Sequence, residues 1–162
     1  MQNKILKYDF LIIGSGLIGS LAAISLIKKK YKVLVLEKEK LSNINKKDQR
    51  TLAVNANSRE FLHKIGLWSR LKDGHADIQK IFIKTPIYHD QLIFEDDTES
   101  MGSVIFNKDL LALAHRELIN KKAIVDQASM SFNEILNDKK IKIKNNYVKF
   151  NKIIIATGKK LT

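Results

Sequence analysis

Three glycines near the N-terminus have the spacing of a phosphate-binding turn. The run Gly14-Ser15-Gly16-Leu17-Ile18-Gly19 reads G-x-G-x-x-G, and it follows an apolar stretch and opens a helical pattern. Gly14 permits a tight turn, Gly16 leaves room for a pyrophosphate to approach the backbone amides, and Gly19 lets the helix pack close to the strand. The free N–H groups and partial positive charge of a helix N-terminus favour an anion. Gly14, Ser15, Gly16 and Gly19 are therefore candidate cofactor-binding residues.

A carboxylate at the end of the next apolar stretch completes the pattern. Glu37 lies where it would accept hydrogen bonds from the hydroxyls of an adenosine ribose. A negative charge there would repel a 2′-phosphate, so NADP is not expected in this first site. The first forty residues thus predict a βαβ dinucleotide-binding unit, but the glycine pattern alone does not separate FAD from NAD.

The elements that hold this site are predicted from hydrophobic periodicity. Tyr8–Ile13 and Tyr31–Leu36 are strands with nearly continuous apolar residues, which is typical of a parallel sheet covered on both faces. Leu17–Lys29 is a helix that ends in three lysines, which suit its C-terminal dipole. Ala123–Asp126 is predicted as a third parallel strand and Lys152–Thr157 as a final buried strand.

The middle of the chain is predicted to hold shorter elements. Residues 38–54 are polar and are expected to form a long loop. A short helix is expected to begin near Asn57, since Asn57 and Glu60 have capping-box spacing, and Gly66 suits the left-handed position after it. Phe61, Leu62 and Ile65 are expected to face inward. A strand is predicted over Ile78–Lys84, with Gln91–Glu95 pairing nearby, and a helix is predicted to open at Asn107. Ser131–Phe150 is predicted to hold period-two strands separated by an Asn145–Asn146 turn.

Composition limits the classes of function. The chain has 162 residues, 44% hydrophobic and 28% charged, and a net charge of +12. The excess charge is almost all lysine and is spread along the chain, so nucleic-acid binding is not expected. The lysines are expected to form a solvated surface with weak attraction to anionic lipid. With no cysteine, disulfide and thiolate chemistry are excluded. No apolar run approaches the roughly 20 residues of a membrane span, so a cytoplasmic location is expected.

The four histidines, His63, His75, His89 and His115, show no metal-ligand spacing, and no metal site is predicted from them.

The residues beyond the first unit resemble one family. Asp48-Gln49-Arg50-Thr51-Leu52-Ala53, followed by Ser58, Leu62 and Ile65-Gly66-Leu67-Trp68, is similar to a D-x-R-x-x-A-[LV]…L-x-x-[IL]-G-x-W stretch. That stretch belongs to the FAD-dependent hydroxylases of ubiquinone biosynthesis, which are para-hydroxybenzoate-hydroxylase-like flavoprotein monooxygenases. Gly102–Leu110 resembles the segment that enters the family's next helix. The resemblance covers residues 8 to about 158.

The resemblance implies a fold and a cofactor. The fold is α/β and Rossmann-like, with a parallel sheet, an antiparallel β hairpin or meander and part of a substrate-domain sheet. Residues 1–162 would form an FAD-binding domain, with the start of the substrate-domain sheet at 78–105. FAD would be held additionally by Arg50, near its pyrophosphate and ribitol, and by Asn107 through a hydrogen bond. Trp68 is expected to pack in the interior rather than to serve as a substrate platform.

The chain departs from the family in two places. The family's A-D-G motif stands here as Ala156-Thr157-Gly158, without the acid. Ala-Thr-Gly still resembles the strand-to-loop turn beneath FAD in other flavoproteins, so Gly158 is a further candidate cofactor-binding residue. Family members also continue for about as many residues again, including a G-D motif. The chain is therefore expected to be a C-terminally truncated half that is unstable or prone to aggregate alone. Its expected partner is a separately encoded C-terminal half.

The family's activity is the hydroxylation of a polyprenylated phenol with NAD(P)H and O2, and such a substrate would bring the enzyme to the inner membrane as a peripheral protein. No catalytic acid or base is assigned. Two alternatives stay open: an NAD-linked oxidoreductase on the same fold, which the Arg50–Trp68 block disfavours, and a non-catalytic remnant of such a gene.

Overall fold

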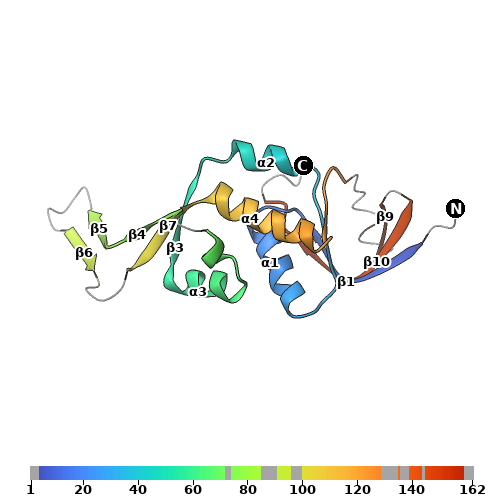
Figure 1. Cartoon of the computed structure of the whole chain (residues 1–162), viewed down its shortest axis with the longest axis horizontal. Coiled ribbons are helices and arrows are strands. Elements are labelled where there is room, and N and C mark those ends of the chain that lie inside the picture. The colour runs from blue at the N-terminus through green and yellow to red at the C-terminus, as the bar shows by residue number, and fades with distance from the viewer. Residues whose placement is uncertain are drawn as a thin grey trace. The chain divides into compact units, whose positions relative to one another are not determined.

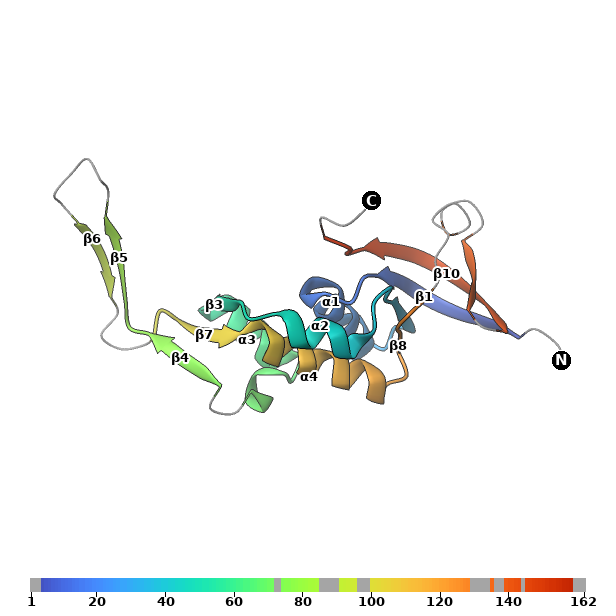
Figure 2. The ribbon, with the colours of Figure 1, turned by 90° about the horizontal axis from the view of Figure 1, so that it is seen from above.

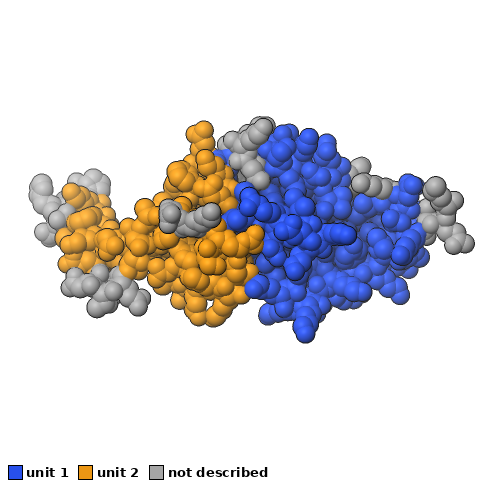
Figure 3. Space-filling model, in the orientation of Figure 1, with its two compact units in different colours: residues 1–48, 111–162 blue, residues 49–110 orange. Residues whose placement is uncertain are grey.

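The chain folds into two compact units. The computed structural model describes residues 4–71, 74–84, 91–95, 100–128, 135, 139–143 and 145–158 (Figure 1). Unit 1 comprises residues 1–48 and 111–162, and unit 2 comprises residues 49–110 (Figure 3). Among the helices of the described ranges, none has the length and apolar character that crossing a bilayer requires.

Unit 1 is built on a five-stranded sheet in the order β8-β2-β1-β10-β9. The first four strands are parallel, and β9 pairs with β10 in the antiparallel direction. The elements are β1 (Ile5–Ile13), α1 (Leu17–Lys28), β2 (Val33–Leu36), α2 (Leu41–Lys47), β8 (Ile124–Val125), β9 (Lys140–Ile143) and β10 (Asn146–Ile155). The predicted α/β fold with a parallel sheet and an antiparallel hairpin is confirmed.

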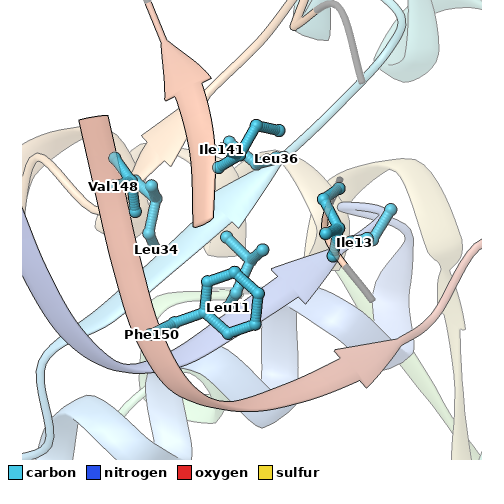
Figure 4. Packing of buried hydrophobic residues seen from close by; sticks show 8 residues of the cluster. Leu11, Ile13, Leu34, Leu36, Ile141, Val148 and Phe150 are labelled. Atoms are coloured by element: carbon cyan, nitrogen blue, oxygen red, sulfur yellow. The ribbon is translucent and has the colours of Figure 1, made fainter. Parts of the chain in front are cut away.

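One hydrophobic cluster of unit 1 lies on one face of this sheet. Alternate residues of β1 and β2, namely Leu11, Ile13, Leu34 and Leu36, are buried together with residues of β9 and β10 (Figure 4). The intervening residues are buried as well and point to the opposite face. Burial on both faces explains why these strands are apolar at nearly every position.

Two sequence-based predictions, one on residues 38–54 and one on β10, are wrong. Residues 38–54 are not a loop, since they contain α2 and most of β3 (Thr51–Asn55). The start of α2 is stabilised by Asp126, whose carboxylate accepts a hydrogen bond from the Leu41 N–H at 3.2 Å. Lys152–Thr157 is not a separate buried strand, because β10 continues without interruption from Asn146 to Ile155 and Ile155 is exposed.

Unit 2 has a three-stranded antiparallel sheet and a separate two-stranded one. The first has the order β3-β7-β4, and the second is the hairpin of β5 and β6 (Figure 1). The elements are β3, α3 (Ala56–Lys64), a 3-10 turn (Trp68–Arg70), β4 (His75–Ile78), β5 (Lys80–Lys84), β6 (Gln91–Glu95), β7 (Gly102–Phe106) and the first residues of α4 (Asn107–Asn120). The predicted pairing of Gln91–Glu95 and the helix opening at Asn107 are confirmed.

Three details of unit 2 differ from the sequence-based predictions. The cap of α3 is Asn55, whose side chain accepts the Ser58 N–H at 2.9 Å, and not Asn57. Phe61 is 39% exposed and does not face inward, whereas Leu62 and Ile65 are buried. Ile78–Lys84 is divided between β4 and β5, which belong to different sheets. Gly66 does adopt the predicted left-handed conformation, with φ 77°.

Candidate functional site

Three turns of unit 1 meet at the carboxyl edge of the parallel sheet. Ile13 at the end of β1 lies in register with Leu36 on one side and Ile155 on the other, and Figure 2 shows β1 and β10 running side by side. The Gly14 N–H donates to the Leu36 carbonyl and the Ala156 N–H donates to the Ile13 carbonyl, each at 2.8 Å. β2 and β10 flank β1, so the chain changes direction along the sheet here. Ligands of open α/β sheets bind at such a switch point.

The glycines divide into two that pack and one that faces open space. Gly14 has φ +97°, and a Cβ on it would lie 2.6 Å from the Ala156 carbonyl oxygen. A Cβ on Gly19 would lie only 2.1 Å from the Gly14 carbonyl oxygen. A Cβ on Gly16 would meet nothing within 4 Å. The open space at Gly16 is where a diphosphate has access to the main chain.

The start of α1 presents backbone donors beside that space. Gly16 is the N-cap, and the first helical hydrogen bond runs from the Ser20 N–H to the Gly16 carbonyl at 2.9 Å. The N–H groups of Gly16 and Leu17 therefore precede the hydrogen-bond ladder of the helix. The first turn contains no carboxylate to neutralise the positive end of the dipole. This end of α1 can accept an anion.

Glu37 follows β2 and is hydrogen-bonded to the glycine turn. Its Oε2 accepts the Ser15 N–H at 2.7 Å and the Ser15 hydroxyl at 2.8 Å, and its Oε1 accepts the Glu39 N–H at 3.0 Å. Burial raises the pKa of Glu37, but the hydrogen bonds from Glu39, Ser15 and the Lys38 backbone outweigh burial and hold that pKa below its usual value. Glu37 is therefore ionised at neutral pH and can act only as an acceptor, as contact with ribose hydroxyls requires.

A buried histidine also touches this turn. His115 on α4 is 2% exposed, and its Nε2 lies 2.7 Å from the Ser15 carbonyl oxygen. This contact of His115 is not indicated by metal-ligand spacing, which is the property by which the histidines were interpreted from the sequence. A signal was nevertheless available, because Leu111, His115 and Leu118 have the i, i+4, i+7 spacing of one helix face, and both leucines are buried.

Arg50 and Asn107 are brought together within unit 2. The antiparallel pairing of β3 with β7 places Thr51 opposite Phe106, and the Asn107 N–H donates to the Arg50 carbonyl at 2.9 Å. Asn107 is buried and the side chain of Arg50 is exposed. Their binding to a cofactor stays a prediction.

Two further predicted positions have simple surroundings. Gly158 has φ +66°, and a Cβ on it would meet nothing within 4 Å. Trp68 is buried, and its ring lies 5.3 Å from that of His75 and 6.0 Å from that of His63, measured between centroids. Trp68 is thus a packing residue.

A parallel sheet with a glycine turn, an open helix N-terminus and an acid after the second strand defines a dinucleotide-binding domain. Residues 7–137 match the family model described as FAD binding domain, which is well over half of the chain. The chain belongs to this family of FAD-binding domains.

Solved structures have the same fold at low sequence identity. PqsL of Pseudomonas aeruginosa, described as a probable FAD-dependent monooxygenase, is 11% identical with a TM-score of 0.67, and the match covers 91% of this chain and 41% of PqsL. The rebeccamycin biosynthetic enzyme RebC is 11% identical with a TM-score of 0.62, covering 94% of this chain and 33% of RebC. A flavoprotein/dehydrogenase of Cytophaga hutchinsonii is 17% identical with a TM-score of 0.61, covering 94% and 39%. No curated protein matches the chain. The chain spans well under half the length of these structural neighbours.

Proposed function

We propose that this chain is the FAD-binding portion of a flavin-dependent aromatic-ring monooxygenase. The observation that carries the proposal is the meeting of three turns at one sheet edge: the Gly14–Gly19 turn, Glu37 and Ala156–Gly158. The match to the FAD-binding domain family and the monooxygenase fold of the neighbours support it.

The residues present fit the adenosine diphosphate half of FAD. The amides of Gly16 and Leu17 would donate to the pyrophosphate, which the partial charge of α1 would also attract. Glu37 would accept the ribose hydroxyls with the lone pairs that Ser15 and Glu39 leave open. Arg50 and Asn107 are proposed on the flavin side, from the sequence resemblance. When bound, FAD supplies the redox chemistry, and the protein supplies position and electrostatics.

The finer assignment to ubiquinone biosynthesis is also a proposal. It is supported by the resemblance of the Arg50–Trp68 block to those hydroxylases. On this proposal the substrate is a polyprenylated phenol, NAD(P)H is the reductant, and the lysine-rich surface gives weak peripheral attraction to an anionic membrane. Because Trp68 is buried in packing, the phenol would be held by other residues.

Titration of the purified full chain with nucleotides tests the proposal. We expect one FAD per chain with a shift in flavin absorbance, weaker binding of ADP-ribose, and no binding of 2′-phospho-ADP-ribose, because ionised Glu37 repels the extra phosphate. Calorimetry gives the stoichiometry and affinity of each. Tighter binding of NAD than of FAD would instead support an NAD-linked oxidoreductase, and no binding of either would support a remnant.

The partner is proposed to be a polypeptide that corresponds to the part of the structural neighbours that the match does not cover. The β5–β6 hairpin in unit 2 carries large apolar side chains that are 40–56% exposed. They are Ile81, Phe82, Ile83, Leu92, Ile93 and Phe94. Because neighbouring residues of a strand point to opposite faces, both faces of the hairpin are apolar. Exposed apolar surface of this kind is typical of a protein interface.

Changing one opposed pair on this hairpin tests the partner proposal. Phe82 lies opposite Ile93, and the double variant Phe82→Thr/Ile93→Thr should lower self-association of the chain and its capture of the polypeptide encoded downstream. Light scattering measures self-association, and co-purification measures capture of the downstream polypeptide. The matched control is Lys80→Thr/Glu95→Thr, which changes the opposed salt-bridged pair of the same hairpin and should alter neither. A wild-type chain that stays monomeric in light scattering, or a downstream sequence that encodes no such half, would contradict the proposal.

A further inference from the structure

The Ser15 carbonyl is the centre of a buried polar cluster. It accepts a hydrogen bond from the Ser20 hydroxyl at 2.8 Å and lies 2.7 Å from His115 Nε2, and all three residues are buried. A carbonyl oxygen can only accept, so Nε2 carries the proton. Nδ1 of His115 then carries no proton in the neutral ring, and it has no hydrogen-bond partner among the described residues.

The surroundings of His115 keep the ring neutral. Burial lowers the pKa of His115, and this effect outweighs the Ser15 carbonyl and the charge of Glu37, which both raise that pKa. At neutral pH the ring is therefore a single tautomer with one donor, and that donor is committed to the glycine turn.

Holding the Ser15 carbonyl also orients the Gly16 amide. Both groups belong to one planar trans peptide unit, so the Gly16 N–H points opposite to the Ser15 C=O. The preceding peptide is fixed as well, because the Ser15 N–H donates to Glu37 at 2.7 Å. With both peptides held, the Gly16 N–H stays on the side away from His115 and beside the space into which a Cβ would project freely.

The two donors to Ser15 differ in what they anchor. Ser20 belongs to α1, the helix that the turn itself begins, so its bond is local. His115 comes from α4, a helix one hundred residues further along the chain. Of these two donors to the Ser15 carbonyl, the histidine is the one that comes from outside α1.

We propose that His115 is a positioning residue of the dinucleotide site: its Nε2–H holds the Ser15 carbonyl, so that the Gly16 amide is presented to a phosphate. The inference rests on the proposed function, in which this turn binds the pyrophosphate of FAD. His115 itself touches the turn and is assigned no contact with the cofactor.

Two substitutions in the full chain separate the hydrogen bond from the volume of the ring. His115→Gln keeps an N–H donor at a similar reach, and His115→Met keeps the bulk without a donor. We expect His115→Met to weaken FAD and ADP-ribose binding about 3- to 10-fold and His115→Gln to keep it within about twofold. Ser103→Ala is the control, because Ser103 is also buried and its hydroxyl donates a part-buried hydrogen bond to Asp77 in unit 2, away from the glycine turn. It should lower Tm without changing the affinity.

Nitrogen NMR of the ligand-free protein gives a second readout that needs no cofactor. We expect the Nε2–H tautomer for His115 and slow exchange of the Ser15 amide, which Glu37 protects. The Nδ1–H tautomer would overturn the proposal, even if His115→Met failed to fold. Wild-type affinity retained in His115→Met would also overturn it and leave FAD binding intact. If the wild-type protein shows the expected tautomer but binds no FAD, the proposed function is refuted, whereas the hydrogen bond from His115 to the Ser15 carbonyl is confirmed.

Discussion

Gly16→Ala is expected to weaken FAD binding about 100-fold or more and to leave the fold intact. Gly16 has φ −58° and ψ 177°, which alanine adopts without strain, and beyond its neighbours in the chain the added methyl would meet nothing within 4 Å. The methyl would instead occupy the space through which a diphosphate reaches the amides. Loss of two hydrogen bonds to a charged group, each about 1.5–3 kcal/mol, corresponds to about 100-fold weaker binding or more.

Calorimetric titration with FAD and a thermal melt of the same Gly16→Ala sample measure both halves of this expectation. Unchanged Tm with lost affinity is the expected pair of results. If Gly16→Ala bound FAD as tightly as the wild type, the pyrophosphate could not lie against this turn, and the proposed site would be wrong.

Gly19→Ala is expected to have the opposite effect, a loss of stability. The added Cβ would lie 2.1 Å from the Gly14 carbonyl oxygen and 3.2 Å from the Ala156 Cβ, so α1 or β1 must shift. Overpacking of this kind costs about 1–3 kcal/mol, and each kcal/mol lowers Tm by about 2–4 °C in a chain of this size. Denaturant unfolding followed by circular dichroism measures the free energy.

Gly16→Ala is the matched control for Gly19→Ala, since both place one methyl group on the same turn. Helix propensity alone would make Gly19→Ala stabilising by about 1 kcal/mol, because alanine is the better helix former. A more stable Gly19→Ala variant would therefore show that α1 and β1 do not approach as closely as described.

The βαβ unit could be predicted because its signals are local. The apolar strands, the helix between them and the glycine turn occupy the first forty residues, and each is visible in a short window. The same holds for Gly66, whose left-handed conformation depends on neighbouring residues.

The predictions that failed depend on residues far apart in the sequence. The start of α2 is stabilised by Asp126, so no pattern within residues 38–54 indicates it. His115 reaches the glycine turn from α4, and metal-ligand spacing was the wrong test for it. The division of Ile78–Lys84 between two sheets is decided by the partners of each half, since β4 pairs with β7 and β5 with β6.

The pairing of β1 with β10 has a consequence for biosynthesis. Ile5 lies in register with Tyr147 and Ile13 with Ile155. β1 is synthesised before the other strands of the sheet, so it cannot pair along this edge until β10 has been synthesised. The close packing of Gly14 against Ala156 also forms only after β10 has paired with β1. A nascent chain that lacks β10 exposes one edge of β1 and cannot complete the turn. Release of β10 from the exit tunnel is therefore the earliest moment at which this sheet can be completed around the glycine turn.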